Sequence, residues 1–94
     1  MIEWKNQELC VTAKIDAQNA EQVYQQGLKL IQQQRLPVVV NLAEMQHGST
    51  LALAIFVQWL KQTPQTQDLK FKAVPEKMLK IIQACHLEHD LNLI

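Results

Sequence analysis

The residues best suited to chemistry lie close together near the C-terminus of the chain. Cys85, His86, His89 and Asp90 are all of types that bind zinc, and a structural zinc site needs four such ligands arranged as a tetrahedron. The apolar spacing before them places Cys85 on the inner face of a helix, whereas His89 follows the end of that helix. We therefore expect no metal site, and we interpret the histidines as solvent-exposed residues at a helix C-terminus, where they suit the helix dipole.

Two hydroxyl residues, Ser49 and Thr50, are the candidates for nucleophilic catalysis. Such a nucleophile needs a positioned base, but His47 lies only two residues before Ser49, and chain neighbours at that spacing rarely face each other correctly. The chain has no GxSxG turn. Its two glycines, Gly27 and Gly48, are far apart, which excludes a phosphate-binding P-loop. We expect a protein that is not an enzyme and that has no cofactor.

Length and composition indicate one small globular domain over residues 1–94, with 48% hydrophobic and 19% charged residues. Nine basic residues balance nine acidic ones, which argues against a nucleic-acid binder because such proteins cluster positive charge. The longest apolar run, 51–57, has seven residues, whereas a membrane helix needs about 20, so no direct membrane insertion is expected. Cys10 and Cys85 lack a CxxC partner and are expected to be buried, reduced thiols.

The elements that must position these residues follow from hydrophobic periodicity. Alternation predicts a strand over 8–15, paired with a short strand over 2–4. A continuous β-branched run over 37–40 predicts a central strand that is covered on both faces. Further strands are expected over 69–73 and 91–94, and helices over 16–34 with Asp16 as the cap, over 50–62, and from Pro75 onward. The order predicts a small α/β sandwich with a mixed, mostly parallel sheet, an N-terminal antiparallel hairpin and about three helices.

The second of these helices has an unusual outer face. At 100° per residue its core face consists of Ala52, Ile55, Phe56, Trp59 and Leu60. Thr50, Ala54, Val57 and Lys61 point outward, and Leu53 lies between the two faces. Outward positions of a surface helix are normally charged, so two interpretations stand with equal weight: chance exposure, or a small apolar patch for a partner at a helix N-terminus. In the first helix, Gly27 lies on the apolar stripe, which predicts close approach to a sheet.

The stretch from residue 37 onward resembles a STAS domain, the fold of anti-sigma-factor antagonists and of the cytoplasmic tails of sulfate transporters. The family pattern is an apolar strand followed by D-L-S-x-V-x-x-V-D-[ST]-[AG]-G-L-A-L, and this chain reads VVNLAEMQHGSTLALA over 39–54. Thr50 falls on the family's Ser/Thr at the helix start, while Asn41 and Ser49 replace its two aspartates. Leu69-Lys70-Phe71 and Val74-Pro75-Glu76 resemble its next strand and helix start, and His86-Leu87 stands where the family often has Gly-Leu.

The resemblance implies a function through a partner. The short, neutral chain is most similar to stand-alone family members that bind the cytoplasmic ATPase of an ABC-type phospholipid transporter, which maintains outer-membrane lipid asymmetry in Gram-negative bacteria. This implies a non-enzymatic accessory subunit that regulates or stabilises the ATPase. It would be cytoplasmic, peripheral to the inner membrane, and in one complex with a membrane permease and a lipid-binding subunit.

The contact residues that we expect for this partner are His47, Gly48, Ser49, Thr50, Leu53, Ala54, Val57 and Lys61. In the anti-sigma-factor antagonists the helix-start Ser/Thr is phosphorylated by a kinase partner. The alternative function is therefore a phospho-switch with Thr50 as the phosphoacceptor. A third is an adaptor that acts alone like a transporter tail.

Overall fold

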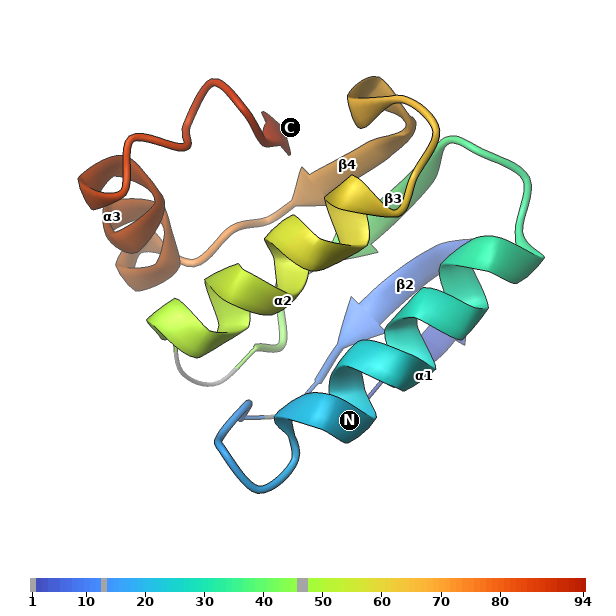
Figure 1. Cartoon of the computed structure of the whole chain (residues 1–94), viewed down its shortest axis with the longest axis horizontal. Helices are drawn as coiled ribbons and strands as arrows, with labels where there is room; N and C mark the ends of the chain where they lie inside the picture. Colours follow the sequence, from blue (N-terminus) through green and yellow to red (C-terminus); the bar gives the residue numbers. More distant parts are fainter. Residues whose placement is uncertain (1, 13, 46–47) are drawn as a thin grey trace.

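The sheet of this protein follows the predicted α/β architecture. The computed structural model describes residues 2–12, 14–45 and 48–94 (Figure 1). Within them, five strands form one sheet in sequential order: β1 (Ile2–Lys5), β2 (Glu8–Val11), β3 (Val38–Asn41), β4 (Leu69–Lys72) and β5 (Asn92–Leu93). The β1–β2 pair is antiparallel and the other three pairs are parallel. The predicted mixed sheet and N-terminal hairpin are confirmed.

Three α-helices and one short 3-10 helix connect the strands: α1 (Ala20–Gln33), α2 (Thr50–Lys61), η1 (Thr66–Asp68) and α3 (Glu76–Ala84). The prediction that Asp16 caps the first helix is wrong by one turn. Its Oδ1 accepts the backbone N–H groups of Gln18 at 2.9 Å and Asn19 at 3.0 Å, which closes a turn before the helix begins. The strand expected over 8–15 is also shorter than predicted, since β2 ends at Val11. Pro75 is likewise the residue before α3, not its first residue.

All helices belong to one side of the sheet, and Figure 1 shows α1 and α2 in front of the strands. Each parallel crossover steps the same way along the sheet, and right-handed crossovers that do so place their helices on the same face. The expectation that the strand over 37–40 is covered on both faces is therefore wrong. Val38 and Val40 face the helices and are 1% and 0% exposed, whereas Val39 lies on the open face and is half-buried.

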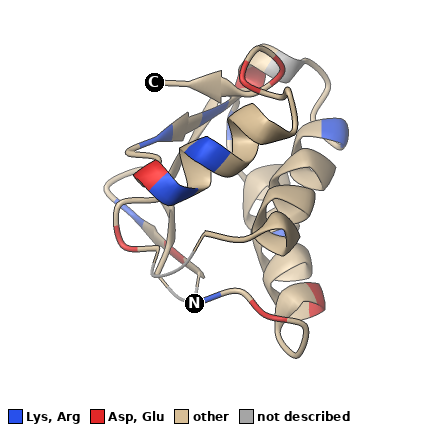
Figure 2. Cartoon of the chain, turned by 90° about the vertical axis from the view of Figure 1, so that its left-hand side faces the viewer, with Lys and Arg blue, Asp and Glu red and all other residues tan. Residues whose placement is uncertain are grey.

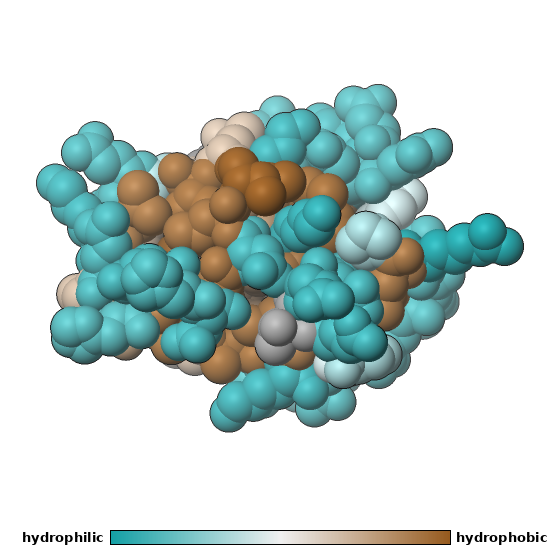
Figure 3. All heavy atoms as spheres, turned by 90° about the horizontal axis from the view of Figure 1, so that it is seen from above, coloured by the Kyte–Doolittle hydropathy of each residue, from teal (hydrophilic) through white to brown (hydrophobic). Residues whose placement is uncertain are grey.

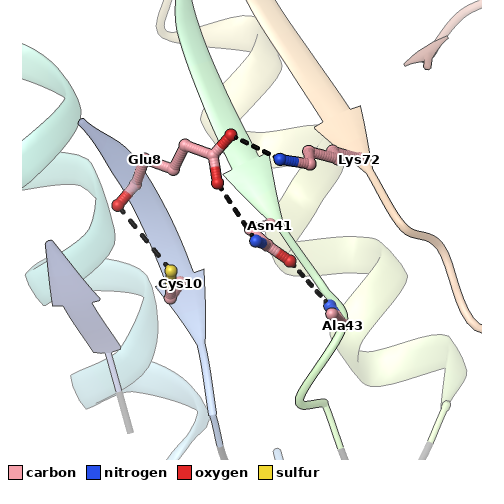
Figure 4. A network of polar contacts seen from close by, with 5 residues as sticks. All are labelled: Glu8, Cys10, Asn41, Ala43 and Lys72. Atoms are coloured by element: carbon pink, nitrogen blue, oxygen red, sulfur yellow. Dashed lines mark hydrogen bonds and ion pairs between the residues drawn. The ribbon is translucent and has the colours of Figure 1, made fainter. Parts of the chain in front are cut away.

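The open face of the sheet carries a network of polar side chains from three strands (Figure 4). Lys72 Nζ of β4 lies 2.8 Å from Glu8 Oε2 of β2. Asn41 Nδ2 of β3, the strand between them, donates to Glu8 Oε1 at 3.1 Å. The hydrogen bonds from Lys72 and Asn41 hold the pKa of Glu8 below its usual range. The network therefore joins β2 to β4 across β3 and pairs the charges of Glu8 and Lys72 within the fold.

The helix layer is fixed by one close contact between α1 and α2. Trp59 of α2 is fully buried, which confirms the predicted core face, and its ring packs against Gly27 of α1. The indole N–H also donates to the Tyr24 carbonyl oxygen at 3.0 Å. A Cβ on Gly27 would lie 2.6 Å from Cε2 of Trp59, which is overlap. The prediction that Gly27 approaches the sheet is thus wrong: it approaches the neighbouring helix.

The inner face of α3 is shorter than expected. Met78 and Ile82 are buried, but Cys85, which was expected on the same inner face, is exposed. The helix has ended at Ala84, and His86 adopts a left-handed backbone with φ of 57° that turns the chain away. The expectation of two buried thiols therefore holds for Cys10 alone, where burial raises the pKa of the thiol.

Gly27→Ala should destabilise the domain. Alanine is favoured over glycine inside a helix by about 1 kcal/mol, but here its methyl group overlaps the buried Trp59 ring, and overpacking costs about 1–3 kcal/mol. Thermal or urea unfolding measures whether the substitution lowers or raises the free energy of unfolding. The exposed neighbour Gln26→Ala should stay within about 0.5 kcal/mol of wild type. In a Trp59→Phe background the cost of Gly27→Ala should shrink, and an unchanged cost would mean that the ring is not the cause.

Glu8→Gln should remove part of the acid sensitivity of folding. Because the folded pKa of Glu8 is lower than its usual value of about 4.5, its contribution to stability is complete above that pH and is lost as pH falls through the folded pKa. The variant should be less stable than wild type at pH 7, and the difference should vanish in acid. Glu3→Gln, an exposed change on the adjacent strand, is the matched control. A difference that persists unchanged in acid would contradict the role of the ion pair.

Candidate functional site

The candidate site is built on the N-terminus of α2, where two adjacent hydroxyl residues have different roles. Ser49 is the N-cap: its Oγ accepts the backbone N–H of Ala52 at 3.0 Å, and its carbonyl oxygen accepts that of Leu53 at 3.1 Å. Thr50 is the first residue of the helix, and its side chain is exposed. The hydroxyl of Ser49 is therefore used to start the helix, while that of Thr50 faces solvent.

Gly48 positions this helix start against α3. A Cβ at Gly48 would lie 3.0 Å from the backbone nitrogen of Met78 and 3.2 Å from its Cα. These are backbone atoms in the first turn of α3, so they have little freedom to give way. The absence of a side chain lets the loop before α2 rest on α3, and this contact sets where Ser49 and Thr50 lie. His47, also expected at this site, lies outside the described residues.

The predicted outer face of α2 is on the surface, except that Leu53 is buried. We call Thr50, Ala54, Val57 and Lys61 the outer ridge: Thr50, Ala54 and Lys61 are exposed, and Val57 is half-buried against the core. Leu53 is only 4% exposed and belongs to the core, so the expectation that it borders a surface patch is wrong. Because α3 packs beside α2, the helix has two covered sides rather than one.

A groove between α1 and α2 borders the outer ridge, and it is not evident from the sequence alone. Its volume is about 280 Å³, and it is lined by Ala20, Glu21, Tyr24, Leu51, Ala54, Ile55 and Gln58. We call it the interhelical groove. The signal for it in the sequence is the set of small or apolar residues at 20, 51 and 54, which lie at or beside outward positions of the two helices. These residues form a groove only because particular faces of α1 and α2 meet, and the fold is needed to show which faces do so.

A second apolar area lies elsewhere. Seen from above (Figure 3), apolar side chains gather in one region framed by hydrophilic ones. This side of the molecule holds β5 and the end of the chain (Figure 1). Ile94 is 65% exposed and is the large hydrophobic residue that stands out most in the described part of the chain. Its backbone N–H donates to Phe71 at 2.8 Å, so the backbone at this position is anchored to β4.

The cysteine, histidines and aspartate near the C-terminus lie exposed on the surface. Cys85, His86, His89 and Asp90 are all exposed, and no group of three or more His, Cys, Asp or Glu among the described residues could hold a metal ion. Figure 2 shows basic and acidic residues interspersed over the chain. In the described part, no helix is both long enough and apolar enough to cross a bilayer. The site thus consists of surface shape and polarity.

Ser49→Ala should lower stability, whereas Thr50→Ala should not. Removing an N-cap oxygen costs about 0.5–2 kcal/mol, while an exposed surface change stays within about 0.5 kcal/mol. Urea unfolding of both variants separates the folding role of Ser49 from the free hydroxyl of Thr50. Equal effects of the two substitutions would contradict this division.

Comparisons with known proteins agree with this geometry. A chain of the structure titled "Acinetobacter MlaFEDB complex in ATP-bound Vtrans2 conformation" is 59% identical with a TM-score of 0.92, over 100% of this chain and 99% of that one. A chain of the same complex in the ATP-bound Vtrans1 conformation is 58% identical with a TM-score of 0.91, over 100% of both. No match was found among curated proteins. The family model described as "Mlab, STAS domain" matches residues 2–94. The chain therefore belongs to the MlaB family of STAS domains.

Proposed function

We propose that this chain is the accessory STAS subunit of an ABC-type phospholipid transporter, and that it binds and regulates or stabilises the transporter's ATPase subunit. The observation that carries the proposal is the whole-chain match, at 59% identity, to a chain of the ATP-bound Acinetobacter MlaFEDB complex. An assembly with bound ATP contains a subunit that binds the nucleotide. A small domain without a nucleotide-binding motif is suited to contact that subunit rather than to replace it.

The outer ridge is the contact that we propose for the ATPase. Thr50 and Ala54 are exposed but carry small side chains, so a partner helix or loop can approach the backbone of α2 closely. Lys61 at the far end supplies a charge at the rim of the contact. Interfaces combine a weakly charged centre with a polar rim, and the ridge has this arrangement. Gly48 and Ser49 support it from behind, through α3 and the helix cap.

Regulation through such a contact follows from thermodynamic linkage. A subunit that binds one conformation of the ATPase more tightly shifts the population toward that conformation, by no more than the difference in affinity. The domain would sit at the cytoplasmic face of the inner membrane, in a complex with the permease and the lipid-binding subunit, and support outer-membrane lipid asymmetry. Affinity purification from the native host tests this assembly. Recovery of the chain without an ATPase or permease would overturn the proposal.

Ala54→Glu and Thr50→Glu should abolish capture of the ATPase subunit without unfolding the domain. Both sites are exposed, so stability should change by less than about 0.5 kcal/mol. A carboxylate at the first position of α2 should even raise the melting temperature slightly, since it suits the helix dipole. At an interface the same carboxylate would be buried without a partner, which is costly. Val57 is a poorer probe because it is half-buried against the core.

Ala84→Glu is the matched control, an exposed alanine at the end of α3. It should leave capture intact. Melting curves and pull-downs on all three variants decide the location of the contact. Full capture by both ridge variants would remove the outer ridge from the interface and direct attention to other exposed apolar surface, such as Ile94.

One observation favours the phospho-switch as a second function. The Thr50 side chain is exposed at a helix N-terminus, so its hydroxyl is accessible to a kinase. A phosphate group placed there would be favoured by the helix dipole. Intact mass of the chain purified from its native host measures this directly. A species heavier by one phosphate that is lost in Thr50→Ala would support the switch, and its absence under all growth conditions would leave the transporter function alone.

A further inference from the structure

The interhelical groove has an apolar floor that continues from the outer ridge. Ile55 of α2 is 6% exposed, and Leu51 of α2 and Ala20 of α1 are half-buried around it. Ala54 belongs to both surfaces, since it lines the groove and stands on the ridge. A partner that covers the ridge at Ala54 therefore also covers the groove. What fills the groove depends on the groups at its rim.

The rim of the groove carries one charge, and it is negative. Glu21 in the first turn of α1 is the charged residue of the lining. Its Oε1 accepts from Gln25 at 3.0 Å, and Oε2 has no hydrogen bond with the described residues. Tyr24 lies three residues after Glu21, on the same side of α1, and is half-buried. Its hydroxyl also lacks a hydrogen bond within the described part of the chain. The rim thus offers a carboxylate oxygen, a phenol and an aromatic face.

These groups select the chemistry of the occupant. An acidic or phosphate group would be repelled by Glu21, and a purely aliphatic side chain would desolvate that carboxylate without pairing it. A long basic side chain fits both parts, because its methylene stem can lie on apolar surface while its cationic head reaches a polar rim. Arginine fits best, since its planar guanidinium can donate to a carboxylate and stack on an aromatic ring. Arginine is also among the residues enriched at interface hot spots.

We infer that the interhelical groove receives an arginine side chain of the ATPase subunit, with its stem on Leu51 and Ala54 and its guanidinium at Glu21 and Tyr24. This inference rests on the proposed function and deepens it by naming the chemistry of the contact. The ridge excludes water around the contact, and the groove supplies its charge specificity. The association should then depend on ionic strength more than the outer ridge alone, with its single charge at Lys61, would require.

The test is the dissociation constant of the complex between this chain and the ATPase subunit of the same transporter. Glu21→Gln should weaken binding about tenfold or more, as expected for a close interfacial charge pair. It should also flatten the loss of affinity with rising salt. Glu21→Lys should weaken binding further, because two cations would meet in the groove. Ala20→Leu fills the floor without changing the charge and should weaken binding while leaving the salt dependence steep.

Glu3→Lys is the matched charge control, an exposed reversal on the open face of the sheet, away from the helices. It should bind as wild type does, and melting temperatures of all variants verify that each is folded. Wild-type affinity of Glu21→Lys would overturn the inference, and so would equal weakening by Glu3→Lys. If Ala54→Glu abolishes binding in the same assay, the proposed function stands without the arginine. If wild type binds but neither Ala54→Glu nor Glu21→Lys has an effect, both the ridge contact and the arginine contact fail, whereas no measurable binding of wild type would overturn the proposed function itself.

Discussion

The packing of Trp59 on Gly27 is the contact on which the functional face depends. It sets how closely α2 approaches α1, and the bond from the indole N–H to the Tyr24 carbonyl sets the rotation of one helix against the other. The Phe56 ring continues this contact, with centroids 5.6 Å from Trp59 and 5.4 Å from Phe71 of β4. The width of the interhelical groove and the outward direction of Ala54 follow from this one arrangement.

The two faces of the molecule use their polar groups differently. On the open sheet face, Glu8 is bonded to Lys72 and Asn41, so its charge is consumed within the fold. On the helix face, Glu21 keeps one oxygen that has no bond to the described residues, and the Thr50 side chain is exposed to solvent. Parallel sheets are usually covered on both sides, and here the polar network makes an uncovered face stable in water. The polar groups that we propose for contact with a partner therefore lie on the helices.

Local periodicity predicted those parts of the fold that depend on one segment at a time. The core face of α2 and the N-terminal hairpin follow from spacing alone. Leu53 could not be placed, because its angle falls at the edge of the core face and only the position of α3 decides its burial. Val39 shows the same limit. A run of valines has the same pattern in a sheet covered on one face and in a sheet covered on both, and here the sequential strand order determines that only one face is covered. The interhelical groove combines residues of two helices, so no single segment carries its signal.

A rigid, helix-borne surface is well suited to the linkage that we propose. Association costs free energy when loops and side chains must be ordered, and that cost reduces what remains for binding. Thr50 and Ala54 stand on a helix whose start is fixed by Ser49 and by the close fit of Gly48 against α3. Little ordering is needed on this side of the interface. The difference in affinity between two ATPase conformations can then arise from the shape of the ATPase alone. Under this condition, a small rigid subunit stabilises the conformation that fits its surface.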